Sequence, residues 1–216
     1  SHRYVSEKAA QSLGIKLEQF NCITCHMGNG SSFTAIKNGK SYDTTMGMTP
    51  LEGLVMGTRA GDLDAGVFSF LEANAKMSIK DIDNMLNKKS GLLGLSGVSS
   101  DMREVESAAA EGNKRAQLAV DALVHRTVKY IGAYAALLGR VDAIIFTGGI
   151  GENAIGFRER VMDRLSVFGI ATDKEKNNVR GKEQIISTPQ SSIKVMIVPT
   201  NEELMIALDT KEIVGK

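Results

Sequence analysis

The fold of this chain is decided by the stretch CITCHMGNGSSFTAIKNGKSYDTT, residues 22–45. Short β-prone runs alternate there with the turn dipeptides Asn29-Gly30 and Asn38-Gly39. Asn-Gly readily takes positive φ at both central positions of a turn, which makes it a strong hairpin signal. The stretch therefore predicts a three-stranded antiparallel meander.

The rest of the sequence predicts helices and two further strands. The expected elements, in chain order, are a short helix over 50–56, a helix over 78–86 capped by Ser78, a long helix over 115–139 ending at Gly139, a strand over 142–147, a helix over 155–168, a strand over 193–199, and a final helix that Thr200 or Asn201 caps and that runs towards Val214. A meander followed by helix, strand, helix, strand and helix is the element order of a ribonuclease-H-like α/β unit.

Composition favours a globular protein that binds small molecules. The 216 residues are 43% hydrophobic, and 26 Lys and Arg against 25 Asp and Glu leave a net charge of +1. Without a basic block, nucleic acid and anionic membranes are poor candidates for the main partner. Apolar runs are far shorter than the roughly 18 residues of a membrane span, and the first residues are polar. We expect a soluble, cytoplasmic protein, and the start at Ser1 suggests a processed chain or a piece of a longer one.

Two glycine-rich segments are suited to receive phosphate groups. Residues 26–32 join a histidine and an asparagine to bare backbone at a hairpin tip, and residues 148–153 lie where a strand passes into a helix. Glycine lets a phosphate come within hydrogen-bonding distance of backbone N–H groups. The alternatives are an ordinary hairpin turn and a structural Gly-Gly turn. Neither segment matches the dinucleotide or P-loop patterns.

Two further positions carry charge suited to a phosphorylated substrate. Arg59 lies in the glycine-bracketed loop 57–62, where its guanidinium would grip a carboxylate or phosphate, or pair with Asp62 and Asp64. Asn201-Glu202-Glu203 begins the last helix directly after a strand. A carboxylate there would hold Mg²⁺ directly or through water, or serve as an ordinary partner of the helix dipole.

Residues 22–26 also match the haem attachment pattern C-x-x-C-H. Cys22 and Cys25 would point to opposite faces of a strand, which disfavours a shared ligand or a redox pair. No export signal accompanies them, and histidines at positions 2, 26 and 125 have no zinc-site spacing. We therefore regard a c-type cytochrome as the least favoured alternative.

Six strings, in order along nearly the whole chain, closely resemble the acetate kinase family of the actin and sugar kinase superfamily. They are SHRYVS (1–6), HMGNGSS (26–32), DTTMGMTPLEGLVMGTRAGDLD (43–64), SSDMRE (99–104), FTGGIGEN (146–153) and PTNEEL (199–204). The resemblance implies an α/β, ribonuclease-H-like (actin-like ATPase) domain with a mixed five-stranded sheet flanked by helices and a helical insertion at about 50–112. Residues 1–216 resemble only the C-terminal, nucleotide-binding lobe of that family.

The resemblance implies reversible transfer of the γ-phosphoryl group of ATP to acetate, giving acetyl phosphate and ADP. It assigns His26 to the phosphoryl group during transfer, Asn29 and Gly30 to the nucleotide phosphates, and Arg59 to the substrate carboxylate and the phosphoryl group. Pro50 would form part of the methyl pocket, and Glu202 would hold Mg²⁺, or Mn²⁺ in its place. Adenine and ribose would lie between two sets of residues: Asp101, Met102 and Arg103 on one side, and Gly149, Ile150, Gly151, Glu152 and Asn153 on the other. His26 also counts among the implied nucleotide-binding residues.

The resemblance leaves several alternatives open. Propionate and butyrate kinases share the superfamily, and one more methylene in a pocket changes binding by only about 1–3 kcal/mol. The family's N-terminal lobe, which carries further catalytic groups, is not recognisable in this chain. We therefore expect the isolated chain to have little or no activity, with a non-catalytic nucleotide-binding and dimerisation module as a third reading. The family also implies a homodimer and favours direct in-line transfer over a phosphoenzyme.

Overall fold

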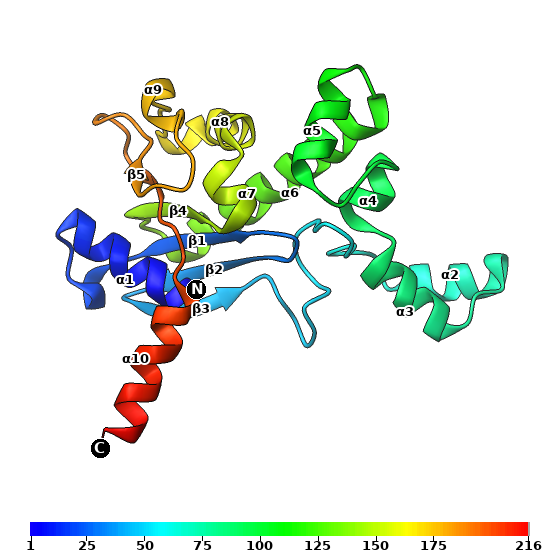
Figure 1. Ribbon diagram of the computed structural model, residues 1–216, viewed down its shortest axis with the longest axis horizontal. Helices are drawn as coiled ribbons and strands as arrows, with labels where there is room; N and C mark the ends of the chain where they lie inside the picture. Colours follow the sequence, from blue (N-terminus) through cyan, green and yellow to red (C-terminus); the bar gives the residue numbers. More distant parts are fainter. Residues whose placement is uncertain (216) are drawn as a thin grey trace.

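A computed structural model describes residues 1–215, with a six-stranded mixed sheet at its centre (Figure 1). The strand order is β3-β2-β1-β4-β6-β5. The strands are β1 (Cys22–Met27), β2 (Ser31–Lys37), β3 (Lys40–Thr44), β4 (Ala143–Thr147), β5 (Gln184–Ile185) and β6 (Lys194–Ile197). The α/β class and the mixed sheet are confirmed, but the predicted count of five is one too low. The additional strand, β5, is only two residues long, too short to produce a periodic pattern.

Strand β1 lies where the sheet changes from antiparallel to parallel. It pairs antiparallel with β2 and parallel with β4, and β4 continues parallel to β6. The carboxyl ends of β1, β4 and β6 therefore meet at one edge of the sheet. In open α/β sheets, ligands bind beyond that edge.

The two Asn-Gly turns of the meander differ. Asn38 and Gly39 have φ of 52° and 72°, as the hairpin pattern predicts. Asn29 and Gly30 do not take positive φ, and the Gly28 N–H donates to the Gly30 carbonyl at 2.9 Å. The tip between β1 and β2 is instead stabilised by a segment outside the meander, because the Asn29 carbonyl accepts the Gly57 N–H at 2.9 Å.

Helices cover both faces of the sheet and form a separate group between β3 and β4 (Figure 1). They are α1 (His2–Leu13), α2 (Gly66–Ala75), α3 (Ile79–Lys88), α4 (Gly91–Ser96), α5 (Met102–Ala110), α6 (Lys114–Leu138), α7 (Gly148–Asn153), α8 (Ile155–Arg164), α9 (Lys174–Asn177) and α10 (Glu202–Val214), with 3₁₀ turns η1 (Leu17–Gln19) and η2 (Ser166–Phe168). Helices α2 to α5 fall within the range of the expected insertion.

The sheet separates two apolar cores. One contains Val5 and Ala9 of α1 with Cys22, and the other contains Leu123 of α6 with Cys25. Both cysteines are buried, and burial raises the pKa of each thiol. Residues three apart in β1 thus face opposite sides of the sheet, as the sequence predicted.

Most predicted helix ends are confirmed. Ser78 accepts the Asp81 N–H at 3.2 Å, Gly139 follows the last residue of α6, and Asn201 accepts the Leu204 N–H at 3.0 Å. The helix predicted over 155–168 ends at Arg164 and continues as the turn η2.

The helix predicted over 50–56 is wrong. Gly53 has a φ of 107°, which α-helices do not accommodate, and its N–H donates to Asp62 Oδ1 at 2.9 Å. The Met56 N–H donates to the Arg59 carbonyl at 3.2 Å. The backbone hydrogen bonds of this segment are therefore made within a closed loop rather than along a helix.

Helix α10 stands apart from both cores. None of its described residues is buried, and in Figure 1 it extends away from the sheet. Within residues 1–215, no helix has both the length and the apolar character that crossing a bilayer requires.

Candidate active site

The carboxyl ends of β1 and β4 place two glycine-rich segments side by side. His26 of β1 pairs with Thr147 of β4, and these strands lead into the hairpin tip and into α7. A cavity of about 1100 Å³ opens beside them. Its walls comprise Gly28, Asn29, Ser100, Asp101, Met102, Arg103, Glu106, Ser107, Gly149, Ile150, Asn153, Ala154, Ile155, Gly156 and Arg180.

One wall of this cavity is α7, which only glycine at its start permits. Gly148 has a φ of 77°, and a Cβ there would lie 2.8 Å from the Met27 carbonyl oxygen. Gly149, Ile150 and Asn153 line the cavity.

The two intervening residues of α7 face the strand ends instead. Gly151 is buried, and a Cβ on it would lie 3.5 Å from the Cys25 carbonyl oxygen. The Glu152 carboxylate accepts N–H groups from Gly148 at 2.9 Å and from Thr200 at 3.4 Å. Glu152 thus joins the ends of β4 and β6 and does not line the cavity.

The other wall is the start of α5. Asp101 accepts the Arg103 N–H at 2.9 Å, and its carboxylate also pairs with the Arg103 guanidinium. These hydrogen bonds lower the pKa of Asp101 to about 2. Met102, between them in the sequence, is buried. All three residues line the cavity, opposite α7.

Arg59 and the hairpin tip approach each other closely because glycines separate them. A Cβ on Gly30 would lie 3.2 Å from Arg59 Nη1, and one on Gly57 would lie 1.9 Å from Asn29 Oδ1. Arg59 Nη1 also donates to the Pro50 carbonyl at 3.2 Å. The structure therefore brings together Arg59, Gly30 and Pro50, next to the cavity that Asn29 lines.

His26 lies half-buried at the end of β1. Its Nδ1 is buried and has no hydrogen-bond partner within residues 1–215. Burial lowers the pKa of His26, and the carboxylates of Glu202 and Glu152 partly oppose that shift. A largely neutral imidazole with an unpaired nitrogen results.

Sequence reasoning missed His2, which packs against His26 with ring centroids 6.2 Å apart. Its Nδ1 lies 2.6 Å from the Thr24 hydroxyl and its Nε2 2.8 Å from the Ser32 hydroxyl. Burial, with added repulsion from His26, lowers the pKa of His2 to about 4. No local pattern signals these contacts, because His2 in α1 is distant in the sequence from its partners in β1 and β2.

Glu202 begins α10 on the side of His26. It accepts the Ser1 hydroxyl at 2.5 Å, and this hydrogen bond lowers the pKa of the carboxyl. Residues 1–215 contain no group of three or more His, Cys, Asp or Glu that would hold a metal by themselves. Mg²⁺ in kinases typically binds one or two carboxylates together with substrate phosphates and water. A single ionised carboxylate such as Glu202 is compatible with that kind of site.

Arg158 was also missed, although it is the largest fully buried side chain of the described residues. Its guanidinium donates to carbonyls of Gly151, Asn177 and Val179 at 2.9–3.0 Å. It thereby joins α7 to the segment that carries Arg180, another cavity residue. Burial lowers the pKa of Arg158 to about 10. Arginine on an amphipathic helix normally indicates a solvated face, so no local pattern marks Arg158 as buried.

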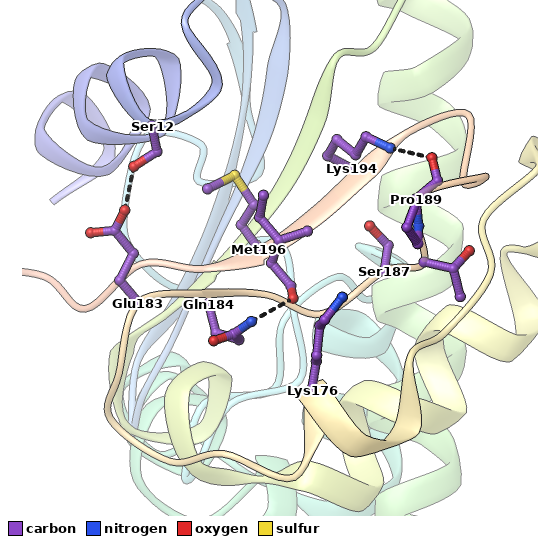
Figure 2. A pocket seen from close by; sticks show the side chains of 10 residues that line it. Ser12, Lys176, Glu183, Gln184, Ser187, Pro189, Lys194 and Met196 are labelled. Carbon is purple, nitrogen blue, oxygen red and sulfur yellow. Dashed lines mark hydrogen bonds between the residues drawn. The ribbon is translucent and has the colours of Figure 1, made fainter.

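A smaller cavity of about 480 Å³ lies at the other end of the sheet, near the start of β6 (Figure 2). Its polar side chains are largely paired with one another or with the backbone. Lys194 Nζ donates to the Pro189 carbonyl at 2.8 Å, and the Ser12 hydroxyl donates to Glu183. It contains none of the predicted site residues.

Known proteins resemble this chain in sequence and in fold. The sequence profile described as Acetokinase family matches residues 1–208. An acetate kinase of Symbiobacterium thermophilum is 56% identical over 99% of this chain and 54% of its own length. The crystal structure of Porphyromonas gingivalis acetate kinase superposes with a TM-score of 0.96 at 51% identity, covering 99% of this chain and 54% of that one.

A propionate kinase from Francisella tularensis is also similar. It has a TM-score of 0.90 and 46% identity, over 96% of this chain and 52% of its own. The chain thus spans about half the length of the relatives it matches. Because the family profile covers nearly all of these residues, the chain belongs to the acetokinase family.

Proposed function

We propose that the protein to which this chain belongs transfers the γ-phosphoryl group of ATP reversibly to the carboxylate of acetate, giving acetyl phosphate and ADP. The observation that carries the proposal is the close approach of Arg59 to Gly30, in the hairpin tip that follows His26, next to a cavity of about 1100 Å³ that Asn29 lines. The similarity to acetate kinases over 99% of the chain supports the choice of substrate.

The cavity suits the nucleoside, between Gly149, Ile150 and Asn153 on α7 and residues 101–103 on α5. The hairpin tip then meets the phosphates, with Asn29 lining the cavity and Gly30 leaving backbone uncovered. Two of the predicted nucleotide residues, Gly151 and Glu152, do not line the cavity. They support its wall indirectly, because they hold the backbone of α7 against the ends of the strands.

Arg59 suits the carboxylate substrate. Only its Nη1 makes a hydrogen bond within residues 1–215, which leaves Nε and Nη2 to grip an anion. Pro50 beside it forms part of the wall against the methyl group. In the forward direction a carboxylate oxygen bonds to the γ-phosphorus as the bond to ADP breaks.

His26 stabilises the phosphoryl group during transfer. Charge in that transition state spreads over the equatorial oxygens, so catalysis depends on positioning and on nearby donors. A half-buried, neutral imidazole donates one hydrogen bond at low desolvation cost. Glu202 would hold Mg²⁺, or Mn²⁺ in its place, and the ion would neutralise phosphate charge when bound.

A propionate kinase is the second candidate, favoured by the 46% identity with the Francisella protein. The two substrates differ by one methylene, which a pocket wall such as Pro50 discriminates weakly. Turnover of acetate, propionate and butyrate, measured as acyl hydroxamates, separates these activities. A kcat/KM for acetate that is lower than that for propionate would contradict the first proposal.

We further propose that the isolated 216-residue chain binds nucleotide but turns over little, since it spans about half of its relatives. Intact mass and hydroxamate formation, measured for this chain and for the protein from its source cells, test this. Ordinary activity in the 23.2 kDa chain would contradict it. A cytoplasmic homodimer is part of the same proposal, and light scattering with ATP titration tests the dimer and the non-catalytic alternative together.

A further inference from the structure

The loop that carries Arg59 is closed by two hydrogen bonds between Gly53 and Asp62. The Gly53 N–H donates to Asp62 Oδ1 at 2.9 Å, and the Asp62 N–H donates to the Gly53 carbonyl at 3.0 Å. Gly61 between them has a φ of 76°, and a Cβ there would lie 2.3 Å from the Leu54 carbonyl oxygen. The two ends of the loop 53–62 are therefore held together.

These joined ends of the loop are hydrogen-bonded to the long helix α6 through two side chains one turn apart. Arg126 Nη1 lies 2.7 Å from Asp62 Oδ2 and also donates to the Gly53 carbonyl at 3.1 Å. The Tyr130 hydroxyl lies 2.8–2.9 Å from both carboxylate oxygens of Asp62. The Arg126 and Asp62 side chains are only 22% and 29% exposed, so solvent competes weakly for these bonds.

The loop has further fixed points on either side of Arg59. The Gly57 N–H donates to the Asn29 carbonyl, and the Ala60 N–H donates to the Leu86 carbonyl of α3, both at 2.9 Å. Arg59 is therefore held on a loop whose base is set by α6 and whose middle touches the hairpin tip. Catalytic groups on such supported loops are held more accurately than those on free ones.

We propose that Asp62, Arg126 and Tyr130 form a clamp of positioning residues that sets the place of Arg59 for a small carboxylate substrate. The proposal rests on the proposed function for the identity of that substrate. None of the three residues lines the nucleotide cavity. Loosening the clamp should therefore weaken carboxylate binding selectively and leave nucleotide binding intact.

Tyr130→Phe is the sharpest test, because it removes one hydroxyl and little else. Tyr134→Phe is its matched control. That residue lies one turn further along α6 in ring contact with Tyr130, and its hydroxyl has no hydrogen bond within residues 1–215. In the protein as its source cells make it, Tyr130→Phe should raise KM for acetate about fivefold, the usual cost of one lost hydrogen bond. The KM for ATP, and the melting temperature relative to Tyr134→Phe, should change little.

Amide hydrogen exchange of the 216-residue chain provides a readout that does not depend on turnover. Tyr130→Phe should speed exchange at Gly53, Gly57 and Asp62, and Tyr134→Phe should not. Equal rises in both KM values, an unchanged KM for acetate, or unchanged exchange would each overturn the clamp. Absence of acetate turnover in the unaltered protein would instead contradict the proposed function, while hydrogen exchange still decides whether the clamp holds the loop.

Discussion

At the scale of single residues, His26 combines features that are costly to maintain without a function. Its Nδ1 is buried without a partner within residues 1–215, and an unsatisfied buried nitrogen costs about 1–3 kcal/mol. His26→Ala should lower kcat by about 10²-fold or more, as loss of a transition-state donor does. ATP affinity measured by calorimetry should stay within a few fold.

His125→Ala, on an exposed position of α6, is the control for that variant. If both variants keep full kcat, the role assigned to His26 is wrong.

His2 and His26, both half-buried, also predict how stability depends on pH. The pKa of His2 falls from 6.5 unfolded to about 4 folded, and that of His26 is also lowered. Between those values the unfolded chain binds more protons, so stability is present above pH 6.5 and is lost as the pH falls towards 4. Urea unfolding at pH 7.5 and 5.5 should show a lower free energy of unfolding at pH 5.5.

His2→Asn should reduce this pH dependence, and His125→Asn should preserve it. Carboxyl groups with lowered pKa, such as Asp101, take up protons below this range and do not confuse the comparison. Equal stability of the unaltered chain at both pH values would contradict the assignment.

At the scale of elements, glycine is required at one position in the loop 53–62 and is replaceable at one position in α6. Gly132 lies inside α6 with open space where a Cβ would be, so Gly132→Ala should stabilise by about 0.5–1 kcal/mol. Gly61→Ala should destabilise by about 2 kcal/mol or more, because positive φ and the Leu54 carbonyl oppose a side chain. Thermal unfolding of the two variants should therefore shift in opposite directions.

Replacing Arg158 should lower stability more than either glycine substitution, because its side chain joins α8 to α7 through buried hydrogen bonds. Arg158→Met keeps the volume but leaves buried carbonyls of Gly151 and Asn177 without their donor. The free energy of unfolding should fall by about 3 kcal/mol. Arg164→Ala, at an exposed position of the same helix, should change it by less than about 0.5 kcal/mol. Equal effects in a urea titration would show that burial of the guanidinium is not the cause.

The sequence predicted those elements whose signals are local. Caps at Ser78 and Asn201 and the Asn38-Gly39 turn depend on neighbouring residues, and all three are confirmed. The conformation of segment 50–56 could not be predicted from neighbouring residues. Its Gly53 hydrogen-bonds to Asp62, and the Gly53 carbonyl accepts a hydrogen bond from Arg126 of the distant helix α6. His2 and Arg158 were missed for the same reason, since their partners are remote in sequence or are backbone carbonyls.

At the scale of the whole molecule, α10 contributes little to the stability of this chain. None of its described residues is buried, and it contacts α1 through surface ion pairs such as Arg3 with Asp209. Exposed ion pairs contribute about 0–1 kcal/mol. A chain ending at residue 200 should therefore unfold within about 1 kcal/mol of the longer one in urea. A loss of several kcal/mol would contradict the exposure of α10.

The order of the strands in the sheet also governs how the chain can fold during synthesis. The meander β1–β3 closes locally, but Cys22 pairs with Ala143, and translation of the intervening 120 or so residues takes roughly 6–24 s at about 5–20 residues per second. For that interval β1 lacks its parallel neighbour and offers an open edge to other chains. Co-translational folding of this protein is therefore limited by the arrival of β4, and aggregation should be most severe for nascent chains that stop between residues 45 and 142.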